Sequence, residues 1–417
     1  MAEEQEAEQL FVRTVAIPDP GDLLRRLPQP DAVAWVHHGA GLAGWGEAVR
    51  VTLPAGEDRF TAGEKWLRSV FDPADVDDQV RLRGTGPVAF GSFTFDASSD
   101  GSVLIVPRVL AGRDGRGRAW LTTVSGPADG EAESLAGSEP VPPKVRAWRD
   151  GSLTGPQWER AVAEAVAAIR AGGLRKVVLA RDVFATAAGP IDVRVLLRRL
   201  AARYPDCFTF ACDGMVGATP ELLVRRAGPE VSALVLGGTL PRGQDRAEDD
   251  ALGAELLASA KNTEEHLYAV DSIRDALRPL CAELAVDPRP ALLKFPNLQH
   301  LGTRVRGTLA ANGTPKSALA LAAAVHPPAA VCGTPAGAAL ELIRELEHMD
   351  RQRYAGPVGW VDADGNGEWG IAIRCAQVSG DTARLFAGCG IVAGSEPAAE
   401  LAETLVKLQP MRGALEG

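Results

Sequence analysis

Two segments of the chain place oxygen-bearing side chains three residues apart within sequences that favour helix. Asn262 and Glu265 form one pair, and Glu400 and Glu403 form the other. Residues i and i+3 lie on the same face of a helix, so each pair is predicted to point in one direction. Two such faces brought together would make a pocket of oxygen ligands that suits Mg²⁺. Either segment alone is more simply explained as a solvated amphipathic helix.

Two further side chains are suited to proton transfer. Lys176 opens an apolar run, 176–185, that is predicted to be a buried strand. An enclosed lysine is desolvated and can act as a general base, whereas a lysine that reaches solvent from a strand edge does no chemistry. Glu221 directly precedes the apolar residues 222–224. It is either a capped or paired carboxylate, or a carboxyl that burial keeps protonated so that it can act as a general acid.

Candidate anion-binding groups occur elsewhere in the chain. Arg374 ends an otherwise apolar run and therefore requires an anionic partner, which is either a structural acid or the carboxylate of a ligand. Lys407 lies one turn after Glu403, so an ordinary i, i+4 ion pair explains it. Glycine-rich segments, predicted to be turns beside strands, can present backbone N–H groups to an anion at Gly238, Thr239 and Gly388.

The composition is that of an ordinary globular protein, with 46% hydrophobic and 24% charged residues in 417. A net charge of −10 argues against general nucleic-acid binding. The acidic first residues do not form a secretory signal, and no run of about 20 apolar residues occurs, so a cytoplasmic location without a membrane partner is expected. The six cysteines lack C-x-x-C spacing and are predicted to be reduced and buried.

Strands and helices are both predicted, which favours an α/β protein with mixed sheets. The expected strands are 32–36, 103–109, 119–124, 176–185, 208–212, 222–226, 231–236, 302–309, 356–361, 368–376 and 382–387. The expected helices are 154–171, 192–204, 249–282, 317–324, 335–352 and 397–408. Residues 214–220 are expected to connect two strands, and residues 126–144 to form a polar surface loop.

Several of these segments occur in an order that resembles the chorismate-utilising enzymes, which include isochorismate, salicylate, anthranilate and aminodeoxychorismate synthases. The segments are 176–181, 218–223, 236–242, 259–266, 299–302, 326–335, 370–374 and 388–396. The resemblance covers residues 150–417 and implies a large mixed-sheet α/β sandwich of the anthranilate synthase component I type. Residues 1–145 would then form a strand-rich portion that completes the sandwich.

The resemblance also implies roles for individual residues. Mg²⁺ would be bound by Glu265 and Glu403 and would hold the ring carboxylate of chorismate. Glu400 and Asn262 would act through metal-bound water, although the family usually has an acid at the position of Asn262.

The remaining substrate contacts are likewise implied by the resemblance. Arg374, the Gly388 backbone and Lys407 would bind the region of the enolpyruvyl carboxylate. Gly238 and Thr239 would lie near C4 of the ring. Tyr354 and His300 are weaker candidates for contact with the substrate.

Within the family, the residues favour an isochorismate synthase. Lys176 resembles the base of the members that add water at C2, and Glu221 suits protonation of the C4 hydroxyl as it leaves. Ala330 stands where salicylate synthases tend to have threonine, and no Leu-Leu-Glu-Ser signature of tryptophan binding is present. Salicylate synthase and a catalytically silent chorismate-binding protein are the alternatives. Isochorismate would feed menaquinone or siderophore biosynthesis, no glutaminase subunit is expected, and the interpretation is compatible with a monomer.

Overall fold

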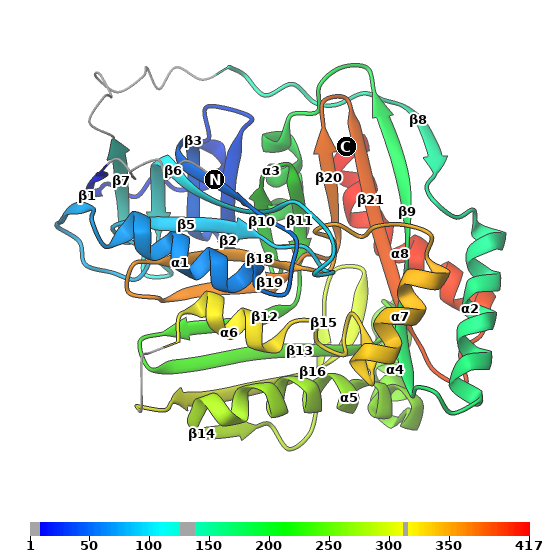
Figure 1. Cartoon of the computed structure of the whole chain (residues 1–417). Helices are drawn as coiled ribbons and strands as arrows, with labels where there is room; N and C mark the ends of the chain where they lie inside the picture. Colours follow the sequence, from blue (N-terminus) through cyan, green and yellow to red (C-terminus); the bar gives the residue numbers. More distant parts are fainter. Residues whose placement is uncertain (1–8, 126–137, 312–315) are drawn as a thin grey trace.

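The computed structural model describes residues 9–125, 138–311 and 316–417, which form a mixed α/β structure (Figure 1). In this part of the chain the strands hydrogen-bond into one sheet of 21 strands. The strands are β1 (Phe11–Ile17), β2 (Ala32–His37), β3 (Ala40–Leu53), β4 (Asp75–Asp78), β5 (Val88–Ser92), β6 (Ser102–Arg113), β7 (Ala119–Ser125), β8 (Val145–Asp150), β9 (Lys176–Ala187), β10 (Phe208–Cys212), β11 (Met215–Thr219), β12 (Leu222–Ala227), β13 (Glu230–Pro241), β14 (Cys281–Val286), β15 (Ala291–Lys294), β16 (Leu298–Leu309), β17 (Gly333–Thr334), β18 (Pro357–Asp362), β19 (Gly367–Ile371), β20 (Cys375–Ser379) and β21 (Thr382–Ile391). The α-helices are α1 (Arg59–Phe71), α2 (Gly155–Arg170), α3 (Val193–Arg203), α4 (Arg246–Ala258), α5 (Ala260–Leu277), α6 (Ala318–Val325), α7 (Ala336–Leu346) and α8 (Pro397–Glu416), with short 3₁₀ turns at Leu23–Arg25 and Arg278–Leu280.

The sheet is largely antiparallel and joins both ends of the chain. Among the strand pairs of the described residues, only β1 and β4 run parallel. Strand β2 pairs with β10, and β5 pairs with β18, each in antiparallel register. Strands from the first 125 residues therefore continue the same sheet as strands from the rest of the chain.

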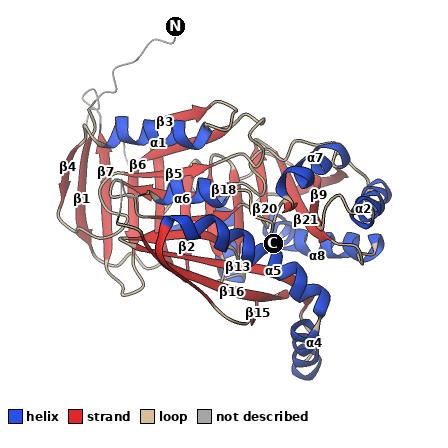
Figure 2. Ribbon diagram, turned by 60° about the horizontal axis from the view of Figure 1, so that its bottom comes forward, coloured by secondary structure: helices blue, strands red, loops and turns tan. Residues whose placement is uncertain are grey.

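Two helices position the acids that the sequence placed three residues apart. Helix α5 packs along β13 and β16, and α8 packs beside β21. Figure 2 shows α4 projecting from the N-terminal end of α5. The carboxylates of both helices are thereby carried to the same region of the sheet.

Helix α2 forms as its sequence predicts. Thr154 and Gln157 make the reciprocal capping box, and the backbone N–H of Thr154 donates to Oε1 of Gln157 at 2.8 Å. The apolar stripe that starts at Trp158 and ends at Ile169 is buried throughout. The helix ends before Gly172, which has a φ of +90°.

The predicted helix 249–282 is wrong, because the structure has two helices there. Ser259 has an extended backbone and ends α4, and its hydroxyl then caps α5 by accepting from the N–H of Asn262 at 3.2 Å. Pro279 lies in the 3₁₀ turn that ends α5, and β14 begins at Cys281. Within residues 249–282, the helix cap at Ser259 and the break at Pro279 therefore determine the structure, and the helical periodicity of the sequence does not.

Two expectations about strands are also corrected. The predicted strand 368–376 is divided into β19 and β20, and between them Arg374 has a left-handed φ of +52°. The predicted connection 214–220 contains strand β11, because Asp213 and Gly214, with φ of +51° and +75°, form a two-residue hairpin turn after β10.

Other expectations concern the loop and the cysteines. Residues 126–137 of the predicted loop lie outside the described residues, and residues 138–144 have no regular secondary structure. All six cysteines are free, and all but Cys281 are buried. Among the described residues, no helix combines the length and apolar character needed to cross a membrane.

Candidate functional site

One cavity brings together every residue to which the sequence analysis assigned a role at the site. It encloses about 830 Å³ of empty space, including its open mouth. The residues assigned a primary role that line it are Lys176, Glu221, Gly238, Thr239, Glu265, Ala330, Arg374, Gly388, Glu403 and Lys407. The secondary candidates Asn262, His300, Tyr354 and Glu400 line it as well. The cavity therefore collects side chains from β9, β13, β16, β21, α5 and α8, which are far apart in the sequence.

Glu221 presents a carboxyl group that burial shifts towards its protonated form. Glu221 directly precedes β12 and is 6% exposed. Burial raises the pKa of Glu221 to about 7, while a hydrogen bond from the Leu236 backbone and the nearby cations Lys176, Arg374 and Lys407 oppose that rise. Of the capped or paired carboxylate that the sequence left open, the ion pair is absent among the described residues, whereas the hydrogen bond from the Leu236 backbone is present.

Lys176 begins β9 and is almost fully enclosed. Its side chain is 2% exposed, and its Nζ lies 3.1 Å from Oε1 of Glu265 on α5. Gly390 on β21 makes room for this pair, since a Cβ there would lie 2.1 Å from Oε1 of Glu265 and 3.0 Å from Cε of Lys176. The interpretation of Lys176 as a solvated edge residue is therefore wrong.

The acids of α8 lie close together on the lining of the cavity. Carboxylate oxygens of Glu400 and Glu403 and the Sγ of Cys389 all lie within 4.8 Å of one another. Burial raises the pKa of Cys389 well above its ordinary value, with further contributions from the charges of Glu403, Glu400 and Glu265, and the thiol donates to the Glu400 carbonyl at 3.3 Å. A neutral thiol that donates a hydrogen bond is a poor metal ligand, so the donors available here are carboxylate oxygens, which suit Mg²⁺.

Lys407 is held by two acceptors at the same end of the cavity. Its Nζ lies 2.5 Å from Oε1 of Glu403, which is the predicted i, i+4 pair, and donates to the Gly388 carbonyl at 2.9 Å. Burial is the largest single influence and lowers the pKa of Lys407, but the charge of Glu403, the neighbouring Cys389 and the hydrogen bond to Glu403 together outweigh it, so the pKa is raised. Lys407 is therefore a permanent cation, and the Gly388 carbonyl is used to fix it.

Arg374 is the cation of the cavity that lacks a protein carboxylate. Its side chain is half-buried on the lining, and no ion pair with it is found within residues 9–125, 138–311 and 316–417. Of the two partners that the sequence left open, a structural acid is thus excluded among the described residues. A guanidinium in this position can bind a ligand carboxylate through two parallel hydrogen bonds.

A bulge in β13 forms one wall of the cavity, next to Asn262 of α5. The register with β16 shifts between Gly237 and Thr239, and Gly238 has a φ of +59°. The Nδ1 atom of His300 lies 3.2 Å from both the Thr239 hydroxyl and the Gly238 carbonyl. Burial, together with the charges of Arg374 and Lys407, lowers the pKa of His300 to about 3, so its ring is neutral.

The predicted glycine turns at Gly238 and Gly388 are strands instead, and the second glycine segment turns only at its end, at Ala393 and Gly394. Gly238 lies within β13, and both Gly388 and Gly390 lie within β21. The role of Gly390 beside Glu265 was missed, although two glycines spaced by two in a strand share a face and signal a close approach on that face. The lining residues Val178, Leu236, Val331 and Ile373 were also missed, because apolar residues carry no chemical signal.

Comparison with known proteins now identifies the family. A family model described as chorismate binding enzyme matches residues 2–416, and the chain belongs to this family. Isochorismate synthase MenF of Bacillus subtilis (strain 168) is 35% identical over 401 residues, which cover 89% of this chain and 84% of that protein. MenF, the menaquinone-specific isochorismate synthase from Escherichia coli, has a structure that matches with a TM-score of 0.81 at 25% identity and covers 98% of this chain and 95% of that one.

The fold recurs in a more distant protein. Anthranilate synthase component I from Streptococcus pneumoniae matches with a TM-score of 0.71 at 21% identity and covers 89% of this chain and 91% of that one. The expected large mixed-sheet α/β fold of the chorismate-binding type is therefore confirmed.

Proposed function

We propose that this protein is an isochorismate synthase, which adds water at C2 of chorismate and releases the C4 hydroxyl as water. The observation that carries the proposal is a single cavity that contains both an enclosed amine, Lys176, and a carboxyl with a pKa of about 7, Glu221. Lys176 would accept a proton from the attacking water. Glu221 would donate one to the departing hydroxyl, so the two proton transfers balance.

The charges of the cavity support a dianionic substrate together with a divalent cation. Before Lys176 gives up the proton that it must lose to act as a base, the formal charges of Lys176, Arg374 and Lys407 are balanced by the three carboxylates Glu265, Glu400 and Glu403 when Glu221 is protonated. Two substrate carboxylates would leave two uncompensated negative charges. Mg²⁺ bound by the carboxylates of α5 and α8 would supply the missing positive charge.

Substrate orientation would rest on the cations and the strand β13 residues that line the cavity. Arg374 is free to pair with the enolpyruvyl carboxylate, and Lys407 adds a fixed positive charge nearby. Gly238 and Thr239 would contact the C4 side of the ring. Ala330 leaves room where a larger residue would narrow the cavity.

The test is to identify the product. Purified protein, chorismate and Mg²⁺ are incubated, and the products are followed by NMR. Isochorismate as the accumulating product is expected. Salicylate with an equal amount of pyruvate would establish the salicylate synthase alternative, and unchanged chorismate would indicate a silent binding protein.

Removal of the metal is expected to stop turnover. EDTA in excess should reduce the rate of chorismate consumption to background, and added Mg²⁺ should restore it, because the carboxylates then lack the charge that holds the substrate. Glu403→Gln should raise the Mg²⁺ concentration needed for half-maximal rate. Glu396→Gln, an exposed acid at the start of α8, is the matched control and should leave that concentration unchanged. Full activity after thorough chelation would remove the metal from the proposal.

The pH profile is expected to have a basic limb set by Glu221. The pKa of this carboxyl is raised to about 7, so it is protonated below that pH and loses its proton as the pH rises. A general acid works only while protonated, and kcat/KM for chorismate should therefore fall about tenfold per pH unit above about pH 7. Rates measured from about pH 5.5 to 9 check this. The same limb persisting in Glu221→Gln would contradict the assignment.

A further inference from the structure

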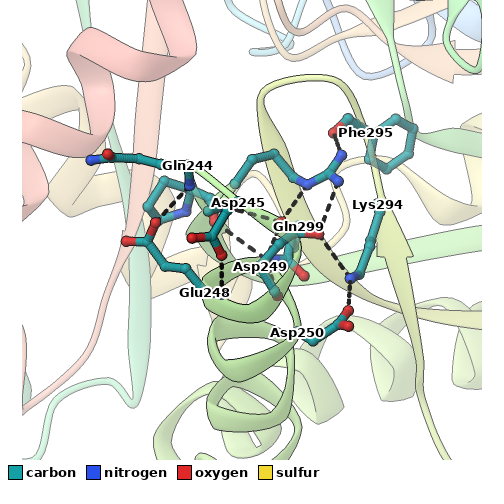
Figure 3. A network of polar contacts seen from close by, with 11 residues as sticks. Gln244, Asp245, Glu248, Asp249, Asp250, Lys294, Phe295 and Gln299 are labelled. Carbon is teal, nitrogen blue, oxygen red and sulfur yellow. Dashed lines mark hydrogen bonds and ion pairs between the residues drawn. The ribbon is translucent and has the colours of Figure 1, made fainter.

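A second network has Asp249 at its centre (Figure 3) and includes Arg242, which follows Thr239 by three residues in the sequence. Asp249 is in the first turn of α4, and its side chain is 9% exposed. Its carboxylate accepts from Arg242 through Nε at 2.6 Å and Nη2 at 2.9 Å, and from Nζ of Lys294 at 2.8 Å. The N–H of Gly243 donates to Oδ1 at 3.1 Å. We call Asp249, Arg242, Gly243, Lys294 and Gln299 the Asp249 clamp.

The clamp ties three strand ends to α4. Arg242 directly follows β13, and its Nη1 also donates to the Phe295 carbonyl just beyond β15, at 2.6 Å. Gln299 is fully buried on β16, and its Nε2 donates to the backbone carbonyl of Asp249 at 3.1 Å and to Oδ1 at 3.2 Å. One carboxylate therefore fixes the ends of β13, β15 and β16 at a single point.

Helices α4 and α5 pack on the strand that carries the wall, but its hydrogen-bonded ladder is short there. After the bulge, only Thr239, Leu240 and Pro241 continue the ladder with β16, and proline has no N–H to donate. Gly238 itself is left out of the pairing and has a left-handed φ. The position of the wall therefore depends on what holds the chain just after it.

The clamp meets the wall from both strands. On β13, Arg242 and Gly243 directly follow Pro241, the last residue of the ladder. On β16, Gln299 adjoins His300, whose ring contacts both Gly238 and Thr239. None of the clamp residues lines the cavity.

We propose that Asp249 is a positioning residue for chorismate: through Arg242 and Gln299 it holds Gly238, Thr239 and His300 at the distance that the substrate ring requires. This inference rests on the proposed function in one respect: the assignment of the C4 side of the chorismate ring as the side that the wall contacts. The wall touches the substrate before and during the reaction alike, so its displacement weakens binding more than it slows the chemical step.

The test is Asp249→Asn, which keeps the size of the side chain and removes the charge that pairs with Arg242 and Lys294. The rate is followed as disappearance of chorismate, which does not depend on the product formed. KM for chorismate should rise on the order of tenfold, with kcat changed less than about threefold. The Mg²⁺ concentration for half-maximal rate should stay unchanged.

Two control variants separate positioning from stability. Asp96→Asn removes a closely similar pair, because Asp96 accepts from Arg344 at 2.7 and 2.8 Å, is 12% exposed and does not line the cavity. It should lower the melting temperature about as much as Asp249→Asn while KM stays normal. Asp250→Asn removes the second partner of Lys294, at 2.8 Å, and leaves Arg242 and Gln299 in place, so KM should also stay normal.

Arg242→Lys keeps the charge but loses the two-pronged geometry, and should raise KM in the same direction by less. If Asp249→Asn does not fold, the KM of Arg242→Lys is the test of the positioning role. An unchanged KM in the folded variant, or a change confined to the Mg²⁺ requirement, would overturn the positioning role. Product identification on the wild-type protein remains a separate test of the proposed function.

Discussion

Glu221→Gln is expected to lower kcat for chorismate by about 10²–10⁴-fold, with KM nearly unchanged. Glutamine matches the shape of the protonated carboxyl and is neutral like it, so the cavity and its charge balance should persist. It cannot deliver the proton that the C4 hydroxyl needs on leaving. The loss should therefore appear in the chemical step and not in binding.

The measurement is steady-state turnover, combined with circular dichroism to establish folding. Glu368→Gln is the matched control, because Glu368 is 8% exposed on the same sheet but pairs with Arg83 and Trp35 outside the cavity. That variant should lose stability and keep kcat per folded molecule. Wild-type turnover in Glu221→Gln would remove Glu221 from the reaction.

Lys176→Ala is expected to lower kcat by a similar factor, about 10²–10⁴-fold, because water at C2 then has no base to take its proton. The variant should remain folded, since the space vacated adjoins an open cavity into which water can enter. Glu265, which loses its partner at 3.1 Å, would still face the cavity.

Lys176→Arg distinguishes a base from a mere positive charge. Arginine keeps a cation beside Glu265 but does not give up its proton in a protein. Both variants should therefore be inactive, and chorismate binding measured by calorimetry should be weakened more in Lys176→Ala. A Lys176→Arg enzyme with near-normal kcat would mean that Lys176 acts only through its charge.

Much of the candidate site could be predicted because its charged residues lie in apolar segments, where burying a charge costs free energy unless the charge has a partner or a function. Glu221 before a buried strand and Arg374 in an apolar run each demand a partner or a function, and both line the cavity. The i, i+3 spacing on α5 and α8 correctly indicated which oxygen-bearing side chains share a helix face, because both pairs line the cavity. That these faces meet depends on the packing of two helices against distant strands, and no local pattern contains it.

The errors in the predicted fold have local physical causes. The left-handed backbone of Arg374 divides a run that looks like one strand, and the Asp213–Gly214 turn folds a segment that looks like a connection. The Asp249 clamp was not predicted, because its members come from four separate elements. Its charged members, Asp249, Arg242 and Lys294, each resemble a solvated surface charge when taken alone.

The pairing of β5 with β18 has a consequence for how the protein is made. Phe90 lies opposite Trp360, and Ser92 lies opposite Val358. One edge of β5 therefore cannot form its hydrogen bonds until β18, which lies much later in the sequence, is available. On the ribosome, that edge stays open until almost the whole polypeptide has emerged. An open edge of apolar sequence invites pairing with other chains. Newly synthesised molecules should thus depend on chaperones far more than the finished enzyme does.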